Sequence, residues 1–348
     1  MNKVNIQNLV RENVKGLSPY SSARDEYVSD GSEMVFLDAN ENPFENGVNR
    51  YPDPQQRELK MVLAHQKGVS VTNILLGNGS DEVLDLIFRA FCEPKEDNII
   101  TLPPTYGMYN VLSVINNIEN REVLLTFDFE PDVEEILKKT DSSTKIIFLC
   151  SPNNPTANSF SRVKILELLT NFKGLIVLDE AYIDFSKEES WLSELNNFNN
   201  LIVTQTLSKA YGMAGIRLGI CFGSEEIITV LNKIKPPYNV NELTQQRALE
   251  RVKKINSVKS EIADILNERD LLSKALLELN FVSKVYETDA NFVLAKLDNA
   301  TERYNQLLKK GIVVRNRTTQ PLCENTLRFT VGTKNENQKL IQVLKELQ

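Results

Sequence analysis

Between residues 75 and 223 the sequence alternates short runs of β-branched and aliphatic residues with segments that have the apolar spacing of amphipathic helices. Continuous apolar runs are typical of strands that are buried on both faces of a parallel sheet. The pattern therefore predicts an α/β fold, with a mostly parallel sheet flanked by helices. The strands expected from these runs lie at 98–102, 122–126, 145–150, 174–179, 201–206 and 218–222.

A second, smaller unit is expected after the sequence KPPYN at 235–239, because two successive prolines cannot continue a helix. A long helical stretch is expected at 242–279, directly after these prolines, and the smaller unit follows it. Its predicted elements are strands near 291–297, 311–315 and 326–332 and a final helix from about 334. We expect three parts in the chain: an N-terminal arm at 1–35, a large domain at 36–237 and a small α+β C-terminal domain at 238–348.

Composition excludes several classes of function. The chain has 348 residues and a formal net charge of −7, which argues against a nucleic-acid partner, because such proteins normally carry a basic face. Its N-terminus lacks the continuous apolar core of a signal peptide, and no run of about 18 apolar residues indicates a membrane span. The four cysteines are far apart with no CxxC pair, so we expect no disulfide framework, no metal site and a cytoplasmic location.

The single histidine, His65, narrows the chemistry further. It lies in a helical pattern with no serine or cysteine motif beside it, and we expect it on the helix surface or in its last turn. Because Ser-His-Asp and Cys-His catalysis both need an imidazole base, these mechanisms are not expected. Lysine is the natural alternative base.

Polar residues follow several predicted strands, at the sheet edge where ligands of doubly wound folds bind. The sequence GNGSDE at 77–82 precedes a helix and is either an anion site or a simple helix cap. Asp179 ends an apolar run, where a carboxylate is costly without a cation. Taken singly, Asp179 reads equally well as a loop aspartate, Asn154 as a turn residue and Lys209 as a surface lysine.

Taken together, these residues indicate a site for a cofactor that carries a phosphate. A carboxylate at one strand end, Lys209 after the next strand, an earlier phosphate cradle and a cation at Arg217 are the parts of a pyridoxal 5′-phosphate site. The lysine would form a Schiff base with the aldehyde of the cofactor, and the aspartate would keep the ring nitrogen protonated.

An ordered set of motifs supports this hypothesis and spans nearly the whole chain. The motifs are LDANENPF (37–44), RYPDPQ (50–55), GNGSDE (77–82), PPTYGMY (103–109), SPNNPT (151–156), LDEAYIDF (178–185), TLSKAYGMAGIRLG (206–219) and LRFTVGT (327–333). With them the sequence resembles the fold type I pyridoxal-phosphate aminotransferases, and most closely the family of histidinol-phosphate aminotransferases. It departs from the usual Asn-Pro-Thr-Gly of the family at Ala157, where glycine would take a positive φ more easily.

The resemblance implies a role for each matching residue. It implies that Lys209 holds the cofactor, that Asp179 pairs with the ring nitrogen, and that Tyr182 and Asn154 meet the ring hydroxyl, so that the expected catalytic residues are Lys209, Asp179 and Tyr182. Tyr106 is expected to stack on the ring. The phosphate is expected among Gly79, Ser80, Asp81, Thr206, Ser208 and Arg217. Tyr51 is expected to reach the cofactor of a neighbouring subunit, which implies a homodimer with shared active sites.

The resemblance also implies an activity, which is transamination of L-histidinol phosphate with 2-oxoglutarate, giving imidazole-acetol phosphate and L-glutamate in histidine biosynthesis. Arg315 and Arg328 are expected to bind the anionic groups of the substrates, with Tyr20 and Asn40 lining the pocket. Two alternatives share the scaffold: an aromatic-amino-acid aminotransferase and a threonine-phosphate decarboxylase. A ligand-sensing regulator of another class would normally carry an additional DNA-binding domain, for which the sequence shows no pattern.

Overall fold

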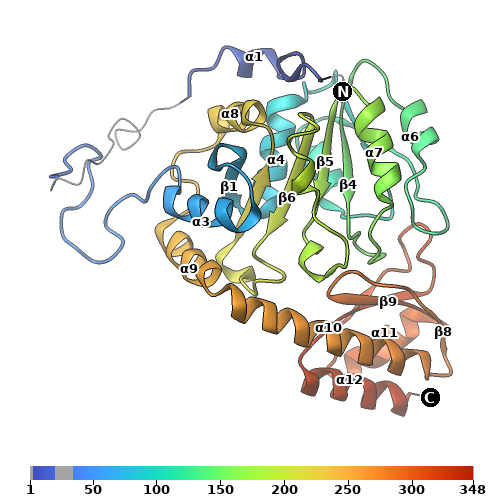
Figure 1. The fold of residues 1–348 in the computed structure, drawn as a ribbon. Coiled ribbons are helices and arrows are strands. Elements are labelled where there is room, and N and C mark those ends of the chain that lie inside the picture. Colours follow the sequence, from blue (N-terminus) through green and yellow to red (C-terminus); the bar gives the residue numbers. More distant parts are fainter. Residues whose placement is uncertain (1–2, 20–33, 348) are drawn as a thin grey trace.

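The computed structural model describes residues 3–19 and 34–347, and it has a large α/β body with a smaller α+β unit at one end (Figure 1). A seven-stranded sheet runs through the large body in the order β1-β7-β6-β5-β4-β2-β3. All neighbouring strands are parallel except at β7, which is antiparallel to both β6 and β1. The strands are β1 (Ile74–Asn78), β2 (Asn98–Thr101), β3 (Glu119–Glu122), β4 (Thr144–Cys150), β5 (Leu175–Asp179), β6 (Leu201–Thr206) and β7 (Leu218–Phe222).

Helices cover both faces of this sheet, which explains the continuous apolar character of its strands. Successive strand residues belong to opposite apolar layers, as Phe148 and Leu149 of β4 do. One layer includes α4, α5 and α8, and the other includes α3, α6, α7 and α9. The helices of the large body are α1 (Glu12–Lys15), α3 (Arg57–Lys67), α4 (Gly79–Phe91), α5 (Met108–Ile115), α6 (Val133–Lys138), α7 (Arg162–Asn171), α8 (Glu225–Ile234) and α9 (Glu242–Lys253).

Short 3-10 turns connect several of these elements. They are η1 (Ile6–Asn8), η2 (Val71–Asn73), η3 (Ile183–Phe185), η4 (Trp191–Glu194) and η5 (Ala214–Ile216). The turn η5 lies between Lys209 and β7. The chain reverses in this connection, because β7 is antiparallel to β6.

The C-terminal unit has its own antiparallel sheet, in the order β10-β11-β9-β8. The long helix α10 reaches from beneath the large body to this unit (Figure 1). Its Val258 packs in the core of the large body, whereas Leu272 and Leu276 pack in the core of the C-terminal unit. The elements are α10 (Ile255–Leu277), β8 (Val282–Val285), β9 (Phe292–Leu297), α11 (Ala300–Lys309), β10 (Arg315–Asn316), β11 (Thr326–Thr330) and α12 (Lys334–Glu346).

The predicted α/β class is confirmed, and five of the six strands predicted in the large domain are present. The strand predicted at 122–126 is wrong, because β3 occupies Glu119–Glu122. Its neighbour β2 ends at Thr101 before Pro103 and Pro104, which have no N–H to extend the ladder. The backbone N–H of Val123 and of Leu125 still donate to Thr101 and Pro103.

Two further predictions need correction. The strand predicted at 311–315 shrinks to Arg315–Asn316, where Arg315 pairs with Arg328 of β11. The helical stretch predicted at 242–279 is two helices, because Lys254 between α9 and α10 has φ −95° and ψ 40°. The structure also contains β1, β8 and α11, which were not predicted individually.

Residues 3–19 of the N-terminal arm pack against the large body of their own chain. Ile6, Val10 and Val14 are buried in the apolar layer that includes α4 and α8. Arg11 forms an ion pair of 3.0 Å with Glu93, and Lys233 Nζ donates to the backbone oxygen of Lys15. This part of the arm therefore belongs to the large body.

The structure also shows where the residues lie that were used above to exclude classes of function. Among the described residues, no helix has the length and apolar character needed to cross a membrane, and no group of histidine, cysteine and carboxylate side chains is arranged to hold a metal ion. The four cysteines are buried free thiols, far from one another in the sequence. His65 is exposed in the last turn of α3, as predicted.

Candidate active site

Twelve side chains gather around one cavity at the carboxyl edge of the large sheet. They come from the ends of β1, β2, β4, β5 and β6 and from the start of β7, which runs in the opposite direction. Strands of this polarity bring residues distant in sequence to one edge. The cavity is lined by Ser80, Asp81, Tyr106, Cys150, Asn154, Asp179, Ala181, Tyr182, Thr206, Ser208, Lys209 and Arg217.

Asp179 is the last residue of β5 and is only 3% exposed. Burial raises the pKa of its carboxyl group, although hydrogen bonds from the Tyr109 hydroxyl and the Ala181 N–H act in the opposite direction. The Tyr109 hydroxyl donates to Oδ2 at 2.9 Å, and the Ala181 N–H donates to Oδ1 at 3.1 Å. A buried carboxyl group held in this way would be stabilised as a carboxylate by a cationic partner in the cavity.

The first turn of α4 forms a close-packed cradle beside Arg217. Gly79 has φ +74°, and a Cβ atom there would lie 2.7 Å from Arg217 Nη2. A Cβ on Gly219 of β7 would lie 2.3 Å from the backbone nitrogen of Ser80. The Gly79 N–H donates to the backbone oxygen of Arg217 at 2.8 Å. No side chain caps this helix at Asn78, so the next N–H groups of its first turn are available for an anion.

Arg217 and Tyr106 approach the cradle from two sides. Arg217 lies 3.5 Å from Asp81, and the Tyr106 hydroxyl donates to the same carboxylate at 3.0 Å. Burial is the largest cause that raises the pKa of Tyr106, followed by the charge of Asp81. Tyr106 therefore stays a neutral phenol, with its ring on the wall of the cavity.

Lys209 lies in the turn that follows β6, with its amine in the cavity. Nζ is 5.6 Å from the centre of the Tyr182 ring. Burial, followed by the positive charge of Arg328, lowers the pKa of the Lys209 amine. The Thr206 hydroxyl accepts from the Ser208 N–H at 3.1 Å and so shapes this turn. The site thus holds an amine that loses its proton more readily than an ordinary lysine.

A second group of cations comes from the C-terminal unit. Arg315 and Arg328 are directly opposite each other on β10 and β11. Arg328 donates to the side-chain oxygen of Asn154, and burial, reinforced by the charge of Arg317, lowers its pKa to about 10. Nε of Arg328 and Nε of Arg317 are buried and have no hydrogen-bond partner among the described residues. The cluster therefore has donors left over for an anionic group.

Residues 151–158 form the loop after β4, which contacts the C-terminal unit beside this arginine cluster. Ala157 is fully buried at φ +71°, so the alanine occupies the left-handed region that a glycine enters more easily. Its backbone oxygen accepts from the Asp289 N–H at 2.8 Å, and the Ser159 N–H donates to the Asp289 carboxylate. The alanine thus retains a turn that is tied to the C-terminal unit.

Besides Ala181, three residues of the site were not predicted. Tyr109 contacts Asp179, Cys150 lines the cavity and Arg317 joins the arginine cluster. Tyr109 lies in the first turn of α5, only three residues after Tyr106, and its N–H donates to the backbone oxygen of Tyr106. Arg317 lies two residues after Arg315, and residues at this spacing share one side of an extended chain. Cys150 carried no sequence signal beyond its place at a strand end.

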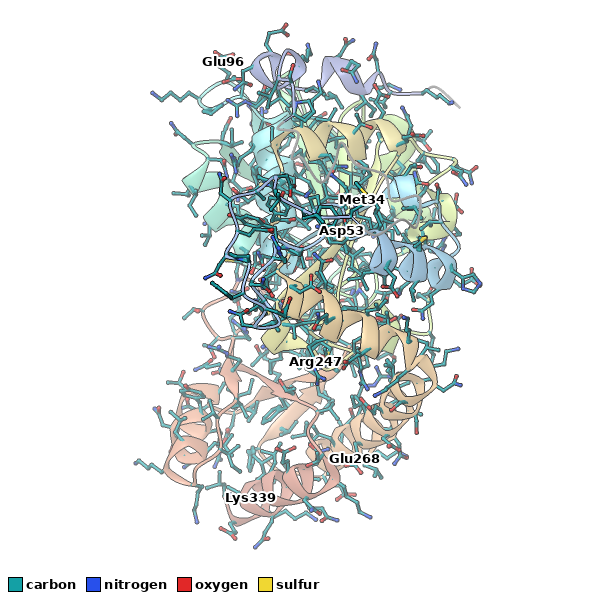
Figure 2. All side chains as sticks on the ribbon, turned by 90° about the vertical axis from the view of Figure 1, so that its left-hand side faces the viewer. Met34, Asp53, Glu96, Arg247, Glu268 and Lys339 are labelled. Carbon is teal, nitrogen blue, oxygen red and sulfur yellow. The ribbon has the colours of Figure 1, made fainter. Side chains whose placement is uncertain are left out.

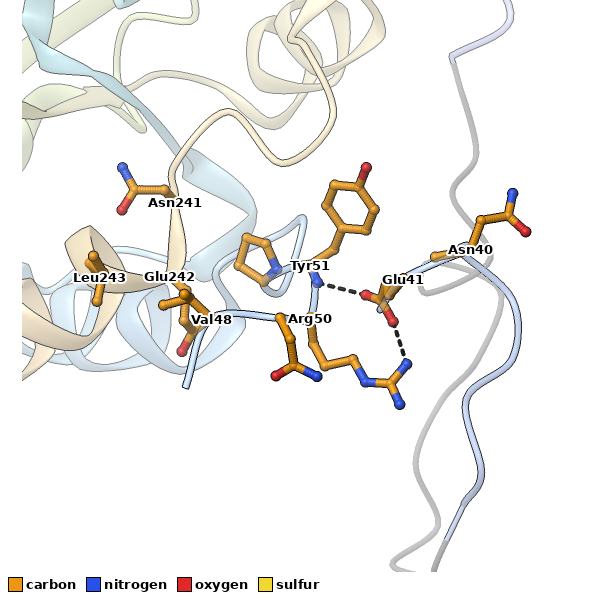
Figure 3. A pocket seen from close by; sticks show the side chains of 11 residues that line it. Asn40, Glu41, Val48, Arg50, Tyr51, Asn241, Glu242 and Leu243 are labelled. Carbon is orange, nitrogen blue, oxygen red and sulfur yellow. Dashed lines mark hydrogen bonds and ion pairs between the residues drawn. The ribbon is translucent and has the colours of Figure 1, made fainter. Parts of the chain in front are cut away.

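The remaining predicted residues lie away from the Lys209 cavity of the same chain. Asn40 and Tyr51 line a separate cavity of about 420 Å³ with residues of α9 (Figure 3). The Tyr51 ring stacks on Tyr238 at 4.5 Å, and Glu41 accepts from the Tyr51 N–H and pairs with Arg50. Tyr20, also predicted to line the substrate pocket, lies outside the described residues.

The geometry fits a phosphorylated aldehyde that carries a basic ring nitrogen. The α4 cradle with Arg217 suits a phosphate, the buried Asp179 suits a protonated ring nitrogen, and the amine of Lys209 suits the aldehyde. These three groups line one cavity, with an aromatic ring beside them. Pyridoxal 5′-phosphate combines all three features.

Comparison with known proteins agrees with this geometry. The model of the family "Aminotransferase class I and II" matches residues 33–344. The chain is 68% identical to histidinol-phosphate aminotransferase of Flavobacterium johnsoniae over 348 residues, covering all of both chains. The crystal structure of the Clostridium acetobutylicum histidinol-phosphate aminotransferase has a TM-score of 0.80 at 26% identity, over 86% of this chain and 91% of the other.

A structure of the Sinorhizobium meliloti histidinol-phosphate aminotransferase in complex with pyridoxal-5′-phosphate has the same fold, with a TM-score of 0.78 at 22% identity, over 86% of this chain and 84% of the other. Fold and site thus define a class I and II aminotransferase. Within that class the chain belongs to the histidinol-phosphate aminotransferase family.

Proposed function

We propose that this protein is an aminotransferase that binds pyridoxal 5′-phosphate and transfers the amino group of L-histidinol phosphate to 2-oxoglutarate. The products are imidazole-acetol phosphate and L-glutamate, as in histidine biosynthesis. The observation that carries the proposal is that a buried carboxyl group, a lysine with a lowered pKa and an anion-binding helix N-terminus meet in one cavity next to an arginine cluster. The family relationship supports it.

The cofactor would be held by residues of the large body. Its phosphate would lie among Gly79, Ser80, Asp81, Thr206, Ser208 and Arg217. Asp179 would pair with the protonated ring nitrogen, Asn154 and Tyr182 with the ring hydroxyl, and Tyr106 with the ring face. When bound, pyridoxal phosphate withdraws electrons from the α-carbon of the substrate and so makes the α-proton acidic.

The chain itself supplies the proton transfer. Lys209 would take the proton from the α-carbon of the substrate and return it at the other end of the reacting system. The lysine must be neutral to accept a proton, and the burial and the neighbouring Arg328 that lower its pKa favour this state. Tyr182, whose pKa is raised by burial, would remain a neutral hydrogen-bond donor.

Substrate anions would bind at the arginine cluster. A phosphate has more acceptor oxygens than one guanidinium can satisfy, and Arg315 and Arg328 lie side by side with Arg317 adjacent. The carboxylate of 2-oxoglutarate would use Arg328 in the second half of the reaction. Tyr20 and Asn40 would also line the substrate pocket. Since Asn40 lies away from the Lys209 cavity of its own chain, it would do so in the proposed dimer.

We also propose a homodimer with shared sites, and it is supported by the position of Tyr51, which lies away from the Lys209 cavity of its own chain. Residues 34–52 extend from the body (Figure 1) and expose Val35, Leu37 and Phe44, each at least 80% exposed. Exposed apolar side chains on one segment are typical of an interface. A second copy of the chain would cover them and receive Tyr51. We also propose a cytoplasmic location. For the division of the chain we propose an arm at 1–35 that packs on the large body, a large domain at 36–237, and a small domain at 238–348 whose first helix, α9, packs against the large body.

The test is a single half-reaction without acceptor. Purified holoenzyme is mixed with L-histidinol phosphate and, separately, with tyrosine, phenylalanine and threonine phosphate, while the absorbance of the cofactor is followed. We expect conversion to the pyridoxamine form at the lowest concentration with histidinol phosphate. Preference for an aromatic amino acid, or release of carbon dioxide from threonine phosphate, would refute the proposed substrate and leave the cofactor site intact.

An arginine variant sharpens this test. Arg315→Met should raise the concentration of histidinol phosphate needed for conversion and change that of tyrosine little, because tyrosine has no phosphate. Arg303→Met is the control, since Arg303 pairs with Asp298 and does not line the Lys209 cavity. An equal loss with both donors would contradict a phosphate-binding role for Arg315.

A further inference from the structure

A second basic pocket lies between α3, η2 and α8, at the amino end of β1 and thus away from the Lys209 cavity at its carboxyl end (Figure 1). It has a volume of about 240 Å³ and is lined by Gln55, Arg57, Lys60, Val71, Thr72, Ile74, Glu225, Ile228, Thr229 and Asn232. None of these residues is used by the proposed activity. A small pocket with mostly apolar walls and a few polar and charged side chains suits a small ligand that carries a polar group.

Lys60 is the unusual member of this pocket. Its side chain is only 5% exposed, yet within residues 3–19 and 34–347 no hydrogen bond or ion pair reaches its amine. Fully buried lysines without a partner are rare, because an isolated ammonium group is costly to remove from water. Asn232 adds a second unsatisfied group, since its Oδ1 is buried without a hydrogen-bond partner in the described chain.

The charges around Lys60 are mostly positive. Lys235, itself 8% exposed, and Arg57 both lower the pKa of Lys60, which burial as the largest cause brings to about 8. Asp53 is the carboxylate that raises this pKa, and it already accepts from Arg57 at 2.7 Å. Glu225 also lines the pocket, on the exposed first turn of α8.

We propose that this pocket is a binding site for a phosphate dianion, either inorganic phosphate or the phosphate of a small phosphomonoester. Such a ligand would pair with the Lys60 amine inside the pocket and meet the positive field of Arg57 and Lys235. In inorganic phosphate, the one protonated oxygen of the dianion can also donate to Asn232 Oδ1. The site is separate from the cofactor and substrate sites, and the proposal does not depend on the proposed activity.

Hydrogen bonds connect this pocket to the cradle of α4. Lys235 Nζ donates to the oxygen of Pro54 and to Asn239 Oδ1. Asn239 Nδ2 donates in turn to the carboxylate of Glu82, which lies in the first turn of α4. Anion binding beside Lys60 would therefore act on both the segment that follows Tyr51 and the start of α4.

The first test measures protection of one amine in the native protein. Holoenzyme is treated with a trace of acetic anhydride in buffer free of phosphate and carboxylate, and acetylation of each lysine is followed by peptide mass spectrometry. Inorganic phosphate, added at constant ionic strength against chloride, should slow acetylation of Lys60 severalfold. Lys339, exposed on α12 (Figure 2), is the internal control and should be unaffected.

Glycerol 3-phosphate forms a second arm. Protection at lower concentration than with inorganic phosphate would assign the pocket to a phosphomonoester, and the reverse order would assign it to free phosphate. If neither compound slows the acetylation of Lys60 relative to chloride, the proposal is wrong.

The second test uses variants. At phosphate about ten times above its Kd, the Tm of the wild-type holoenzyme should rise by roughly 1–2 °C through this site. Lys60→Met should lose that part of the shift and Lys339→Met should keep it, while the cofactor and substrate sites contribute equally in all three proteins. An identical phosphate-dependent shift in the Lys60→Met variant would overturn the proposal.

Discussion

At the scale of single residues, the site depends on groups whose pKa values are shifted by the structure around them. Asp179 is buried with a raised pKa, and Lys209 has a lowered pKa, in each case with burial as the largest cause. Opposite shifts of an acid and a base in one cavity are typical of catalytic sites. Both shifts depend on neighbours that are distant in sequence.

Tyr109 is the neighbour that we expect to orient Asp179. Tyr109→Phe removes the 2.9 Å hydrogen bond to Oδ2 and keeps the ring that stacks on Phe148. Because hydrogen bonds to charged groups contribute about 1.5–3 kcal/mol, kcat should fall about tenfold or more, and the Kd of the cofactor should rise. Tyr304→Phe, on α11, is the control. Unchanged kcat and Kd in Tyr109→Phe would show that Asp179 is held without it.

Lys60 gives a prediction about pH and stability. Its pKa is about 8 in the folded chain, against the ordinary lysine value of 10.5 in the unfolded chain. Between these values the unfolded state binds more protons, so this group makes the protein more stable as pH rises from 8 to 10.5. At pH 7 without phosphate, Lys60→Met should therefore raise the free energy of unfolding, by up to about 3 kcal/mol.

Urea unfolding at several pH values checks this prediction. The advantage of Lys60→Met over the wild type should shrink as pH approaches 10.5, whereas Lys339→Met should show no pH-dependent difference. A constant difference between pH 7 and 10.5 would mean that the ammonium of Lys60 is not disfavoured in the folded protein.

At the scale of secondary-structure elements, the close contact between α4 and β7 shapes the anion cradle. Gly219 packs directly under the backbone of Gly79 and Ser80. The cradle therefore depends on the absence of a side chain at one position of a neighbouring strand. Sequence motifs mark both segments, but their contact is a property of the sheet order β1-β7-β6.

Gly219→Ala tests this contact. A Cβ atom would lie 2.3 Å from Ser80 N, so α4 must move, and overpacking of this kind costs about 1–3 kcal/mol. We expect lower Tm and at least tenfold weaker cofactor binding, measured by equilibrium dialysis. Gly215→Ala is the control, because an added Cβ there meets nothing within 4 Å. Equal cofactor affinity in the two variants would contradict the proposed cradle.

At the scale of the whole molecule, the proposed dimer assigns a role to the extended segment 34–52. Leu37 and Phe44 are 88% and 80% exposed, and a partner would bury them. Leu37→Asp combined with Phe44→Asp should shift the protein toward monomer in sedimentation velocity, because two charges would have to be buried. The cofactor should dissociate more readily as Tyr51 of the partner is lost.

Phe127→Asp is the matched control for this prediction. Phe127 is 89% exposed and lies outside the segment, so this variant should sediment as the wild type does. A wild type that sediments as a monomer, or a double variant that remains a dimer, would count against the shared site.

Local sequence determined much of this architecture. Apolar runs and helix periodicity depend on consecutive residues, so β2, β4, β5, β6, β7 and α4 were predictable, as was the burial of Val83, Leu84 and Phe88 on one face of α4. The collection of Asp179, Lys209 and the Gly79 turn in one cavity was also predictable, because parallel strands bring their carboxyl ends to one edge.

Other features were decided only by tertiary structure. Pairing with β2 placed β3 at Glu119–Glu122 and not at 122–126, and antiparallel pairing brought Arg315 opposite Arg328. The hydrogen bond from Tyr109 to Asp179 and the burial of Lys60 beside Lys235 join residues that are far apart in the chain. The sequence alone encodes the preference of each segment. Packing between segments sets which side chains meet, and thereby their burial and protonation.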